Sequence, residues 1–173
     1  MVHGTHNAVK DDRNDYIKIY VNGEILSRSE AKISVFDSGY LVGDGIWEAV
    51  RLSKGTLIFI DDHLSRLWNA AKATGIQLPF TKQELRDIVH SVLKINNMID
   101  GVHVRIMVTR GIKKTPSQDP RLTISGPNLV IIPEYKLADL KSKTKGIKLF
   151  PSTIRRGSPD YLDPKLTCHS KLQ

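Results

Sequence analysis

The chain lacks the features that would place it among secreted or membrane proteins. It has 173 residues and a single cysteine, Cys168, so no internal disulfide can form, which makes the cytoplasm the expected compartment. No apolar run approaches the roughly 18 residues that a membrane-spanning helix needs. The first ten residues have no apolar core of the kind found in secretion signals. We therefore expect a globular cytoplasmic protein that does not bind membranes.

The charge is unbalanced in favour of bases. Lysine and arginine number 26 against 18 aspartate and glutamate residues, which gives a formal net charge of +8. An excess of basic residues can favour binding of nucleic acid, of an anionic membrane or of a small anionic ligand such as a phosphate. Here the sequence has no arginine-rich arm, no zinc-type spacing of cysteine and histidine, and no ladder of aromatic residues. We therefore do not expect nucleic acid as a partner, and we predict no metal site.

Short strands joined by tight turns account for much of the predicted structure. Tyr16 to Val21 alternates and is rich in β-forming residues, and Asn22-Gly23 after it is a strong hairpin signal, with Glu24 to Leu26 returning. Further strands are predicted over residues 31–35, 46–52, 56–60, 101–110, 128–133 and 146–152. Strands that follow one another through tight turns indicate an antiparallel sheet. The polar residues 1–15 are predicted to be a loose tail.

Two amphipathic helices are predicted in the middle of the chain. The first starts at Asp61 or Asp62 as its cap and ends at Gly75, and the second starts with the capping box Thr81-Lys-Gln-Glu84. Their buried faces are predicted to consist of Leu64, Leu67, Trp68 and Ala71 in the first helix and Leu85, Ile88, Val89, Val92 and Leu93 in the second. A third, short helix is expected over 137–143.

These patterns predict one α+β domain over residues 16–153, in which an antiparallel sheet packs with two helices. The next segment, Ile154 to Pro164, contains the breakers Gly157-Ser-Pro159 and Asp163-Pro164 and is predicted to be a linker. The nine residues that follow it, 165–173, form no further element. We found no internal repeat and no segment of low complexity.

The stretch Asp37 to Arg51 brings together more special-purpose residues than any other. Its glycines predict a tight turn or a close approach of the backbone, and the strand after them carries Trp47 and Glu48 on opposite faces. Spacing alone favours a core tryptophan and a surface glutamate. Arg66 is predicted in the first turn of the next helix, where an arginine and the helix amides can hold a phosphate. From its position alone, a solvated surface arginine is the more favoured interpretation.

Three other basic residues have the chemistry of a site. Arg105 lies on the face of its strand opposite Val102, Val104, Ile106 and Val108, together with His103, and can pair a carboxylate if that face lines a cleft. Otherwise the face is solvated. Lys165 and Lys171 follow the linker, and a lysine whose pKa is lowered can form a Schiff base. A surface lysine is the ordinary interpretation of each.

Several motifs occur together in a recognisable order. The sequence has Asp37-Ser-Gly-Tyr-Leu-Val-Gly-Asp-Gly-Ile-Trp-Glu48 and Asp62-His-Leu-Ser-Arg-Leu67, followed by Val108 to Gly111, Ile131 to Pro133, Arg155-Arg156 and Cys168 to Leu172. From about Tyr16 to its end, the chain resembles the N-terminal domain of fold type IV pyridoxal-phosphate enzymes, the class IV aminotransferases. This family includes branched-chain and D-amino-acid aminotransferases, (R)-selective amine transaminases and aminodeoxychorismate lyase.

The resemblance implies pyridoxal 5'-phosphate as the cofactor and a role for each matching residue. Arg66 would hold the cofactor phosphate. Lys171 would be the Schiff-base lysine, which also moves the proton during the reaction, with Lys165 as the alternative position. Trp47 would shape the substrate pocket, and Tyr40 in the glycine-rich stretch is counted with it. His103-Val-Arg105 is similar to the Tyr-x-Arg motif of branched-chain aminotransferases and would bind the substrate.

Within the family, the motifs favour one substrate class. The Arg-x-His motif of D-amino-acid aminotransferases is replaced by Ile112-Lys-Lys-Thr-Pro116, which favours transfer of an amino group between a branched-chain type amino acid and a 2-oxo acid. His103 in place of tyrosine, and Val42 where such enzymes often have tyrosine, indicate an unusual pocket. The alternatives are an aminodeoxychorismate lyase-like enzyme, a D-amino-acid or (R)-amine transaminase and, from another class, a non-enzymatic basic module that binds nucleic acid.

The resemblance also bears on assembly. Family members are dimers, which implies a homodimer. In the family the lysine is followed by a second domain that supplies a glutamate for the pyridine nitrogen, and we expect that domain to be absent here. Residues 154–173 would then be the interdomain linker and the start of the missing C-terminal domain. On this expectation the chain is a truncated enzyme that holds the cofactor weakly and turns over little.

Overall fold

A single antiparallel sheet organises the protein. The computed structural model describes residues 10–137, 140–155, 157, 158, 160 and 163–170. Within these residues six strands pair in the order β2-β1-β6-β5-β3-β4, every neighbouring pair antiparallel. The strands are β1 (Lys18–Val21), β2 (Glu24–Ser27), β3 (Gly45–Ser53), β4 (Thr56–Leu57), β5 (Val102–Thr109) and β6 (Asn128–Tyr135). The predicted α+β class with an antiparallel sheet and two helices is confirmed.

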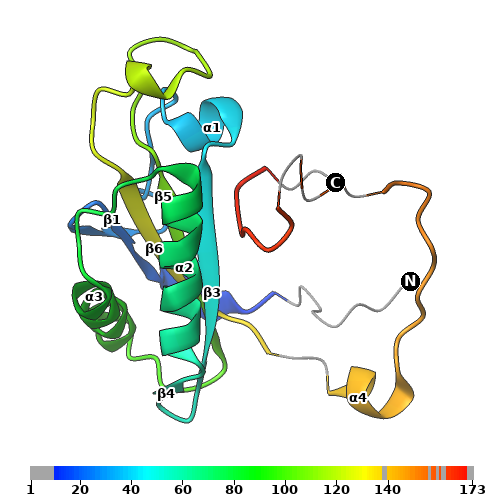
Figure 1. Ribbon diagram of the computed structural model, residues 1–173. Helices are drawn as coiled ribbons and strands as arrows, with labels where there is room; N and C mark the ends of the chain where they lie inside the picture. Colours follow the sequence, from blue (N-terminus) through cyan, green and yellow to red (C-terminus); the bar gives the residue numbers. More distant parts are fainter. Residues whose placement is uncertain (1–9, 138–139, 156, 159, 161–162, 171–173) are drawn as a thin grey trace.

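Two long helices, α2 (Ile60–Thr74) and α3 (Lys82–Ile95), cover one face of this sheet (Figure 1). Alternate residues of β3 and β5, among them Ile46, Val50, Val104 and Ile106, point into this layer and are fully buried. The residues between them are partly exposed on the opposite face, which we call the open face. The sheet therefore has a dry, helix-covered side and an open side.

The helix signals in the sequence are confirmed in most respects. Thr81 and Glu84 form both hydrogen bonds of the predicted capping box, and Gly75 ends α2 with a left-handed φ of 67°. Leu64 and Leu67 are fully buried. The predicted cap of α2 is wrong, because the helix starts earlier: Phe59 is the N-cap, with no side-chain hydrogen bond. Asp61 and Asp62 lie in the first turn, where their negative charges interact favourably with the positive end of the helix dipole.

The first hairpin is confirmed, and the chain before it is more ordered than predicted. Asn22 and Gly23 have φ values of 50° and 102°, the paired left-handed conformation that suits a two-residue turn between β1 and β2. Of the predicted loose tail, residues 10–15 are described, and Asp12–Tyr16 form a 3-10 helix, η1, that Asp11 caps. Because η1 includes Tyr16, β1 starts only at Lys18.

Three predicted strands are wrong or much shorter. Residues 31–35 form a loop in which Ile33 and Val35 are exposed, because this segment pairs with no strand in the described part of the chain. The predicted strand over 56–60 ends at Leu57, since Phe59 already adopts a left-handed φ of 52° before α2. Residues 146–152 alternate like a strand but pair with no described strand, and Leu149 and Phe150 are exposed.

Three short helices complete the described chain. The glycine-rich stretch contains α1 (Ser38–Val42), which the sequence did not predict, capped by the side chain of Asp37. A 3-10 helix, η2 (Pro120–Leu122), lies in the loop between β5 and β6, and α4 (Lys141–Lys145) takes the place of the helix expected over 137–143. Among the helices of the described residues, none has the length and apolar character needed to cross a membrane.

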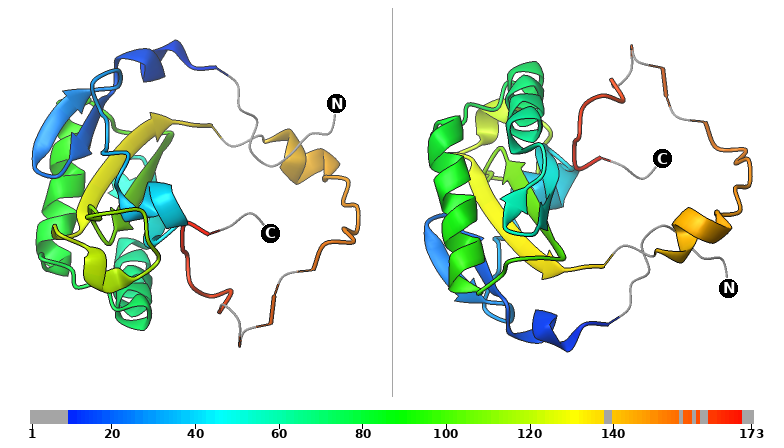
Figure 2. Two further views of the ribbon diagram at one scale, coloured as in Figure 1. Left: turned by 90° about the horizontal axis from the view of Figure 1, so that it is seen from above. Right: turned by 90° about the horizontal axis from the view of Figure 1, so that it is seen from below.

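The last described segment returns to the sheet. After β6 the chain swings away from the sheet around α4 and comes back beside β3 (Figures 1 and 2). There Cys168 forms an antiparallel bridge with Ile46. The segment expected to carry the Schiff-base lysine is thus placed against the strand that carries Trp47.

Candidate functional site

A buried carboxylate anchors the glycine-rich stretch. Asp37 is fully buried, and its oxygens accept hydrogen bonds from Gly39 N at 2.8 Å, Thr109 Oγ1 at 2.6 Å and Asn128 Nδ2 at 2.5 Å. These partners belong to α1, β5 and β6. The start of α1 is therefore tied to the two central strands of the sheet.

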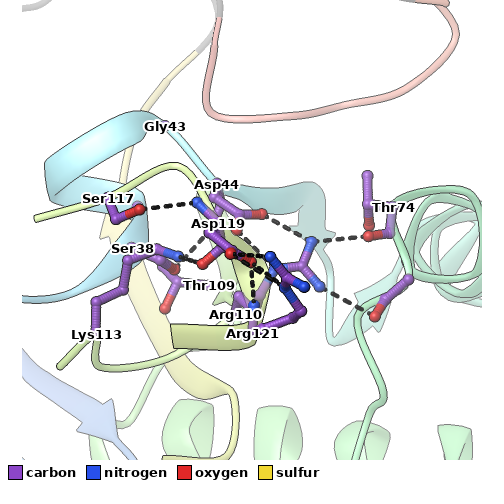
Figure 3. A network of polar contacts seen from close by, with 12 residues as sticks. Ser38, Gly43, Asp44, Thr74, Thr109, Arg110, Lys113, Ser117, Asp119 and Arg121 are labelled. Atoms are coloured by element: carbon purple, nitrogen blue, oxygen red, sulfur yellow. Dashed lines mark hydrogen bonds and ion pairs between the residues drawn. The ribbon is translucent and has the colours of Figure 1, made fainter. Parts of the chain in front are cut away.

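An arginine clamps the other end of the same stretch (Figure 3). Arg110 donates to both oxygens of Asp44, at 2.6 Å from Nε and 3.0 Å from Nη2. It also donates to the carbonyl oxygens of Thr74 at 2.8 Å and Gly75 at 3.1 Å, at the end of α2. A cation at a helix C-terminus is favourable. Arg110 therefore holds the glycine-rich stretch, β5 and α2 in one arrangement.

The C-terminal segment pairs with β3 through its backbone. Trp47 N donates to Thr167 O at 2.8 Å and His169 N donates to Gly45 O at 2.9 Å. The indole Nε1 of Trp47 donates to Cys168 O at 3.0 Å, and Ser170 Oγ donates to the carbonyl of Gly43 at 3.3 Å. Lys171 lies outside the described residues, but its neighbour Ser170 is placed beside the glycine-rich stretch.

Two glycines make room for His169. A Cβ on Gly39 or on Gly45 would lie 2.9 Å from an atom of the His169 ring, closer than side chains pack. Burial lowers the pKa of His169, and Arg105 lowers it further, while the nearby carboxylates of Asp37 and Asp44 act in the opposite direction. Nε2 of His169 is buried without a hydrogen-bond partner among the described residues. Residues 167–170, which we call the docked segment because they lie against β3 and the glycine-rich stretch, therefore contain a histidine whose neutral form is favoured.

A second buried carboxylate lies on the helix-covered side. Glu48 is fully buried and accepts hydrogen bonds from Arg66 Nε at 2.5 Å, Arg66 Nη2 at 2.7 Å and His63 Nδ1 at 2.9 Å. The interpretation that spacing favoured, a core tryptophan and a surface glutamate, is wrong. Trp47 is partly exposed and Glu48 is buried, because α2 supplies partners for the carboxylate.

Arg66 is held in an orientation that suits an anion. Its two bonds to Glu48 use Nε and Nη2, and they raise the pKa of the guanidinium. Nη1 remains as a donor, and 53% of the side chain is exposed. A guanidinium fixed on one edge and open at its end fits a phosphate group. The predicted place in the first turn is wrong, since α2 starts at Ile60, so the helix amides do not join Arg66 in this site.

The predicted substrate residues lie mainly on the open face. The Cζ atom of Arg105 lies 4.2 Å from the centroid of the Trp47 ring, and Arg105 and His103 line one cavity. Tyr40 is 70% exposed on α1. The structure thus brings Trp47, His103 and Arg105 together. Arg66 lies on the other side of the sheet.

Several functional candidates escaped the sequence analysis. The sequence did not predict that Arg66 and His63 both bond to Glu48, although His63 and Arg66 stand three residues apart, a spacing that places them on one helix face. His169 was missed as well. Lys165, the alternative lysine, is exposed, and its backbone N–H donates to Asp163 Oδ1 at 2.9 Å. In the described part of the chain, no three potential metal ligands lie together.

Comparisons with known proteins identify the family to which the chain belongs. The family described as Amino-transferase class IV matches residues 45–157. The chain is 36% identical over 153 residues, 88% of its length, to the branched-chain-amino-acid aminotransferase-like protein 1 of Arabidopsis thaliana. It is 35% identical over 148 residues, 86% of its length, to a putative branched-chain-amino-acid aminotransferase of Methanocaldococcus jannaschii. A D-alanine aminotransferase of Staphylococcus haemolyticus is 39% identical over 95 residues, 55% of this chain and 33% of that protein.

Solved structures show the same fold. The branched-chain amino acid aminotransferase of T.th. with pyridoxamine 5'-phosphate matches 89% of this chain and 51% of its own with a TM-score of 0.77, at 22% sequence identity. The chain spans 27% of the Arabidopsis relative and 50% of the Methanocaldococcus relative. It therefore corresponds to a part of these longer proteins.

Proposed function

The chain belongs to the class IV aminotransferase family, and on this premise we propose that it is part of a pyridoxal-phosphate-dependent enzyme that transfers an amino group between an amino acid and a 2-oxo acid. The observation that carries the proposal is the backbone pairing of residues 167 and 169 with β3. This pairing brings Ser170, which directly precedes Lys171, to the glycine-rich stretch. The half-exposed guanidinium of Arg66 on α2, held by Glu48, also supports the proposal because it can bind the cofactor phosphate.

We propose that Arg66 binds the phosphate of the cofactor. Glu48 holds its guanidinium from the buried side through Nε and Nη2 and is itself bonded by His63, so Nη1 remains as a donor on a half-exposed side chain. Glu48 compensates the charge of Arg66 in part, so we expect the phosphate to be bound by directed hydrogen bonds rather than by net charge. When bound, the cofactor supplies an electron sink for the pair left by a broken Cα–H bond.

We propose that Lys171 supplies the amine that binds the cofactor and that its Nζ takes the proton from the substrate Cα. This role follows from the family motif, because Lys171 lies outside the described residues. Trp47 and Arg105 support a substrate site on the open face, since a guanidinium stacked on an indole is held in a fixed plane and can take a carboxylate. His103 and Tyr40 are proposed to complete the substrate contacts.

The assignment of the lysine can be tested directly. The chain is incubated with pyridoxal phosphate and then treated with sodium borohydride. The borohydride reduces the imine between the cofactor aldehyde and a lysine to a stable secondary amine, and mass spectrometry locates the modified residue. We expect the adduct on Lys171 and its loss in Lys171→Ala, with Lys165→Ala as the matched control. An adduct on Lys165 that persists in Lys171→Ala would contradict the assignment.

We propose a branched-chain type amino acid as the donor, supported by the names of the plant and archaeal relatives. A second candidate is a D-amino acid, which is favoured by the similarity to D-alanine aminotransferases. Assays of amino transfer from L-leucine, L-glutamate and D-alanine distinguish these donors. Release of pyruvate from aminodeoxychorismate would instead identify a lyase. Salt-dependent retention on DNA without cofactor binding would favour the non-enzymatic alternative.

We also propose a homodimer. Between β2 and the end of α1, the apolar side chains of Ile33, Val35, Phe36 and Tyr40 are all exposed. Exposed apolar residues that gather in one segment are typical of an interaction surface. Sedimentation equilibrium measures the mass in solution, and Val35→Asp together with Phe36→Ser should shift the protein to the monomer. An unchanged dimer in this double variant would exclude this segment from the interface.

A further inference from the structure

A histidine shares the carboxylate that holds Arg66. Nδ1 of His63 lies 2.9 Å from Oε2 of Glu48, and Nη2 of Arg66 lies 2.7 Å from the same oxygen. Because both nitrogens bond to one atom, the imidazole and the guanidinium lie side by side. Both side chains also reach the surface, since 25% of His63 and 53% of Arg66 are exposed. A ligand that meets the exposed end of Arg66 is therefore close to His63.

The contacts of His63 decide which ring nitrogen gains or loses a proton. Glu48 accepts two hydrogen bonds from Arg66, at 2.5 Å and 2.7 Å, as an ionised carboxylate does. Its Oε2 accepts from His63 as well, and this network assigns a hydrogen to Nδ1. Nε2 is then an acceptor in the neutral ring and an N–H donor in the protonated ring. The proton that changes the charge of His63 is therefore the one on Nε2.

The net charge of this cluster depends on the histidine. Glu48 and Arg66 cancel each other, so the three side chains have no net charge while the ring is neutral. A protonated ring gives them one net positive charge. Histidine is the side chain that ordinarily changes its charge in the neutral pH range. The attraction that the cluster exerts on an anion is thus set by His63.

The other charged groups near His63 do not replace its proton. α2 packs against β3, and Glu48 is the charged residue on the helix-covered side of that strand. The remaining charged side chains lie on the first turn of α2 and on the part of α3 that contacts α2, and they are two acids and two bases: Asp61, Asp62, Lys82 and Arg86. These four charges balance, so they leave the charge of the cluster to His63.

We propose that His63 is a second ligand of the anion site at Arg66 and that its ring takes up a proton when the anion binds. The proton comes from solvent, an N–H bond forms at Nε2, and no other bond changes. Nε2 then donates to the anion beside Nη1 of Arg66, and the protonated cluster offers a dianion both directed donors and net charge. The inference rests on the proposed function in one respect, since Arg66 is the proposed phosphate ligand. Anion binding needs no cofactor, so the two proposals can fail separately.

The test is titration of the full 173-residue chain with sulfate at constant ionic strength, followed by the NMR signal of Arg66 Cζ. Sulfate is a dianion that, unlike phosphate, keeps its charge throughout the pH range of histidine. We expect its Kd to be about tenfold higher at about pH 8.5 than at about pH 5.5, the effect of one charge-assisted hydrogen bond. This comparison needs no variant. Equal Kd values at the two pH values, or no saturable binding at either, would overturn the proposal.

Matched variants locate the effect at His63. His63→Gln keeps a side-chain N–H that can reach Glu48 but cannot become charged. At both pH values its Kd for sulfate should therefore equal the high-pH Kd of the unaltered chain. His90→Gln is the control, because His90 is exposed on α3, and this variant should keep the tenfold pH dependence. A pH dependence that persists in His63→Gln, or that is lost equally in His90→Gln, would overturn the proposal.

Activity separates this inference from the proposed function. If the Kd values for sulfate follow this pattern but the chain transfers no amino group in any assay, the inference stands and the proposed function fails. If amino transfer is observed while the Kd for sulfate depends on neither pH nor His63, the inference fails alone.

Discussion

Glu48 and Asp37 are both fully buried carboxylates, and their surroundings differ in kind. Asp37 accepts its hydrogen bonds from a backbone amide, a hydroxyl and a side-chain amide, all neutral. Glu48 accepts from an arginine and a histidine. The partners of Asp37 lie inside the protein, whereas Arg66 reaches the surface from Glu48.

This difference separates Asp37, which stabilises the fold, from Glu48, which can orient a ligand-binding arginine. Removing a carboxylate from water is unfavourable, and both acids offset that cost with three hydrogen bonds. At Asp37 the gain is the fixed position of α1 on the sheet. At Glu48 it is the fixed orientation of a guanidinium whose other end faces solvent. The predictions below test this division.

The largest effect is expected from Asp37→Ala. The substitution leaves three inward-facing donors without an acceptor, so the free energy of unfolding should fall by about 3–5 kcal/mol. Urea denaturation followed by circular dichroism measures this. Asp37→Asn keeps one acceptor oxygen and should lose less. A loss below about 1 kcal/mol in Asp37→Ala would show that water replaces the carboxylate.

Glu48→Gln should destabilise the protein less, by about 1–3 kcal/mol, because the half-exposed Arg66 can turn to water. Its more specific effect concerns the cofactor. We expect the affinity for pyridoxal phosphate to fall about tenfold and the affinity for pyridoxal, which has no phosphate, to stay the same. Fluorescence titration with both compounds gives the comparison. Parallel losses for both would mean that Glu48 acts on the fold and not on Arg66.

Gly45→Ala tests the docked segment beside β3. A Cβ at this position would lie 2.9 Å from the His169 ring and 2.9 Å from the Val108 carbonyl oxygen, so His169 must move. Hydrogen exchange at the amides of Trp47 and His169 should become at least tenfold faster. Gly126→Ala is the control, since nothing lies within 4 Å of a Cβ there. Unchanged exchange in Gly45→Ala would mean that the segment does not depend on this gap.

The smallest effect is a pH dependence of the same docking. Burial lowers the pKa of His169 in the folded state, so the undocked segment binds a proton more readily. The resulting stability is complete above the ordinary histidine pKa of about 6.5 and is lost as the pH falls through the lower, folded value. Amide exchange at His169, corrected for its intrinsic rate, should accelerate below about pH 6.5. In His169→Gln this acceleration should disappear.

Local signals predicted much of the fold. The Asn22-Gly23 turn, the Thr81 capping box and the alternation of β5 each depend on residues a few positions apart, and each is confirmed. The strand predicted over 146–152 is absent because alternation of apolar and polar residues is not sufficient for a strand. The segment also needs a partner strand with which to form hydrogen bonds, and it pairs with none among the described residues. Short-range sequence patterns indicate which segments can become helices or strands. Whether a predicted strand forms depends on hydrogen bonding to a partner strand.

The candidate site was harder to predict for the same reason. A glutamate is expected at the surface unless cations meet it in the interior. The partners of Glu48 stand 15 and 18 residues further along the chain, and only the packing of α2 on β3 brings them to it. His169 depends on space beside Gly39 and Gly45, more than a hundred residues earlier. Motifs named Arg66, but the geometry that holds it needed the tertiary structure.

The bond from the Trp47 indole to the Cys168 carbonyl joins residues 121 positions apart in the sequence. Closing a loop of that length costs more conformational entropy than the local hairpins do, by about 0.6 kcal/mol for each doubling of its length. Contacts of such high sequence separation form late, after the sheet edge that receives them exists. We therefore expect the segment that leads to Lys171 to pair with β3 only after the sheet around Trp47 has formed.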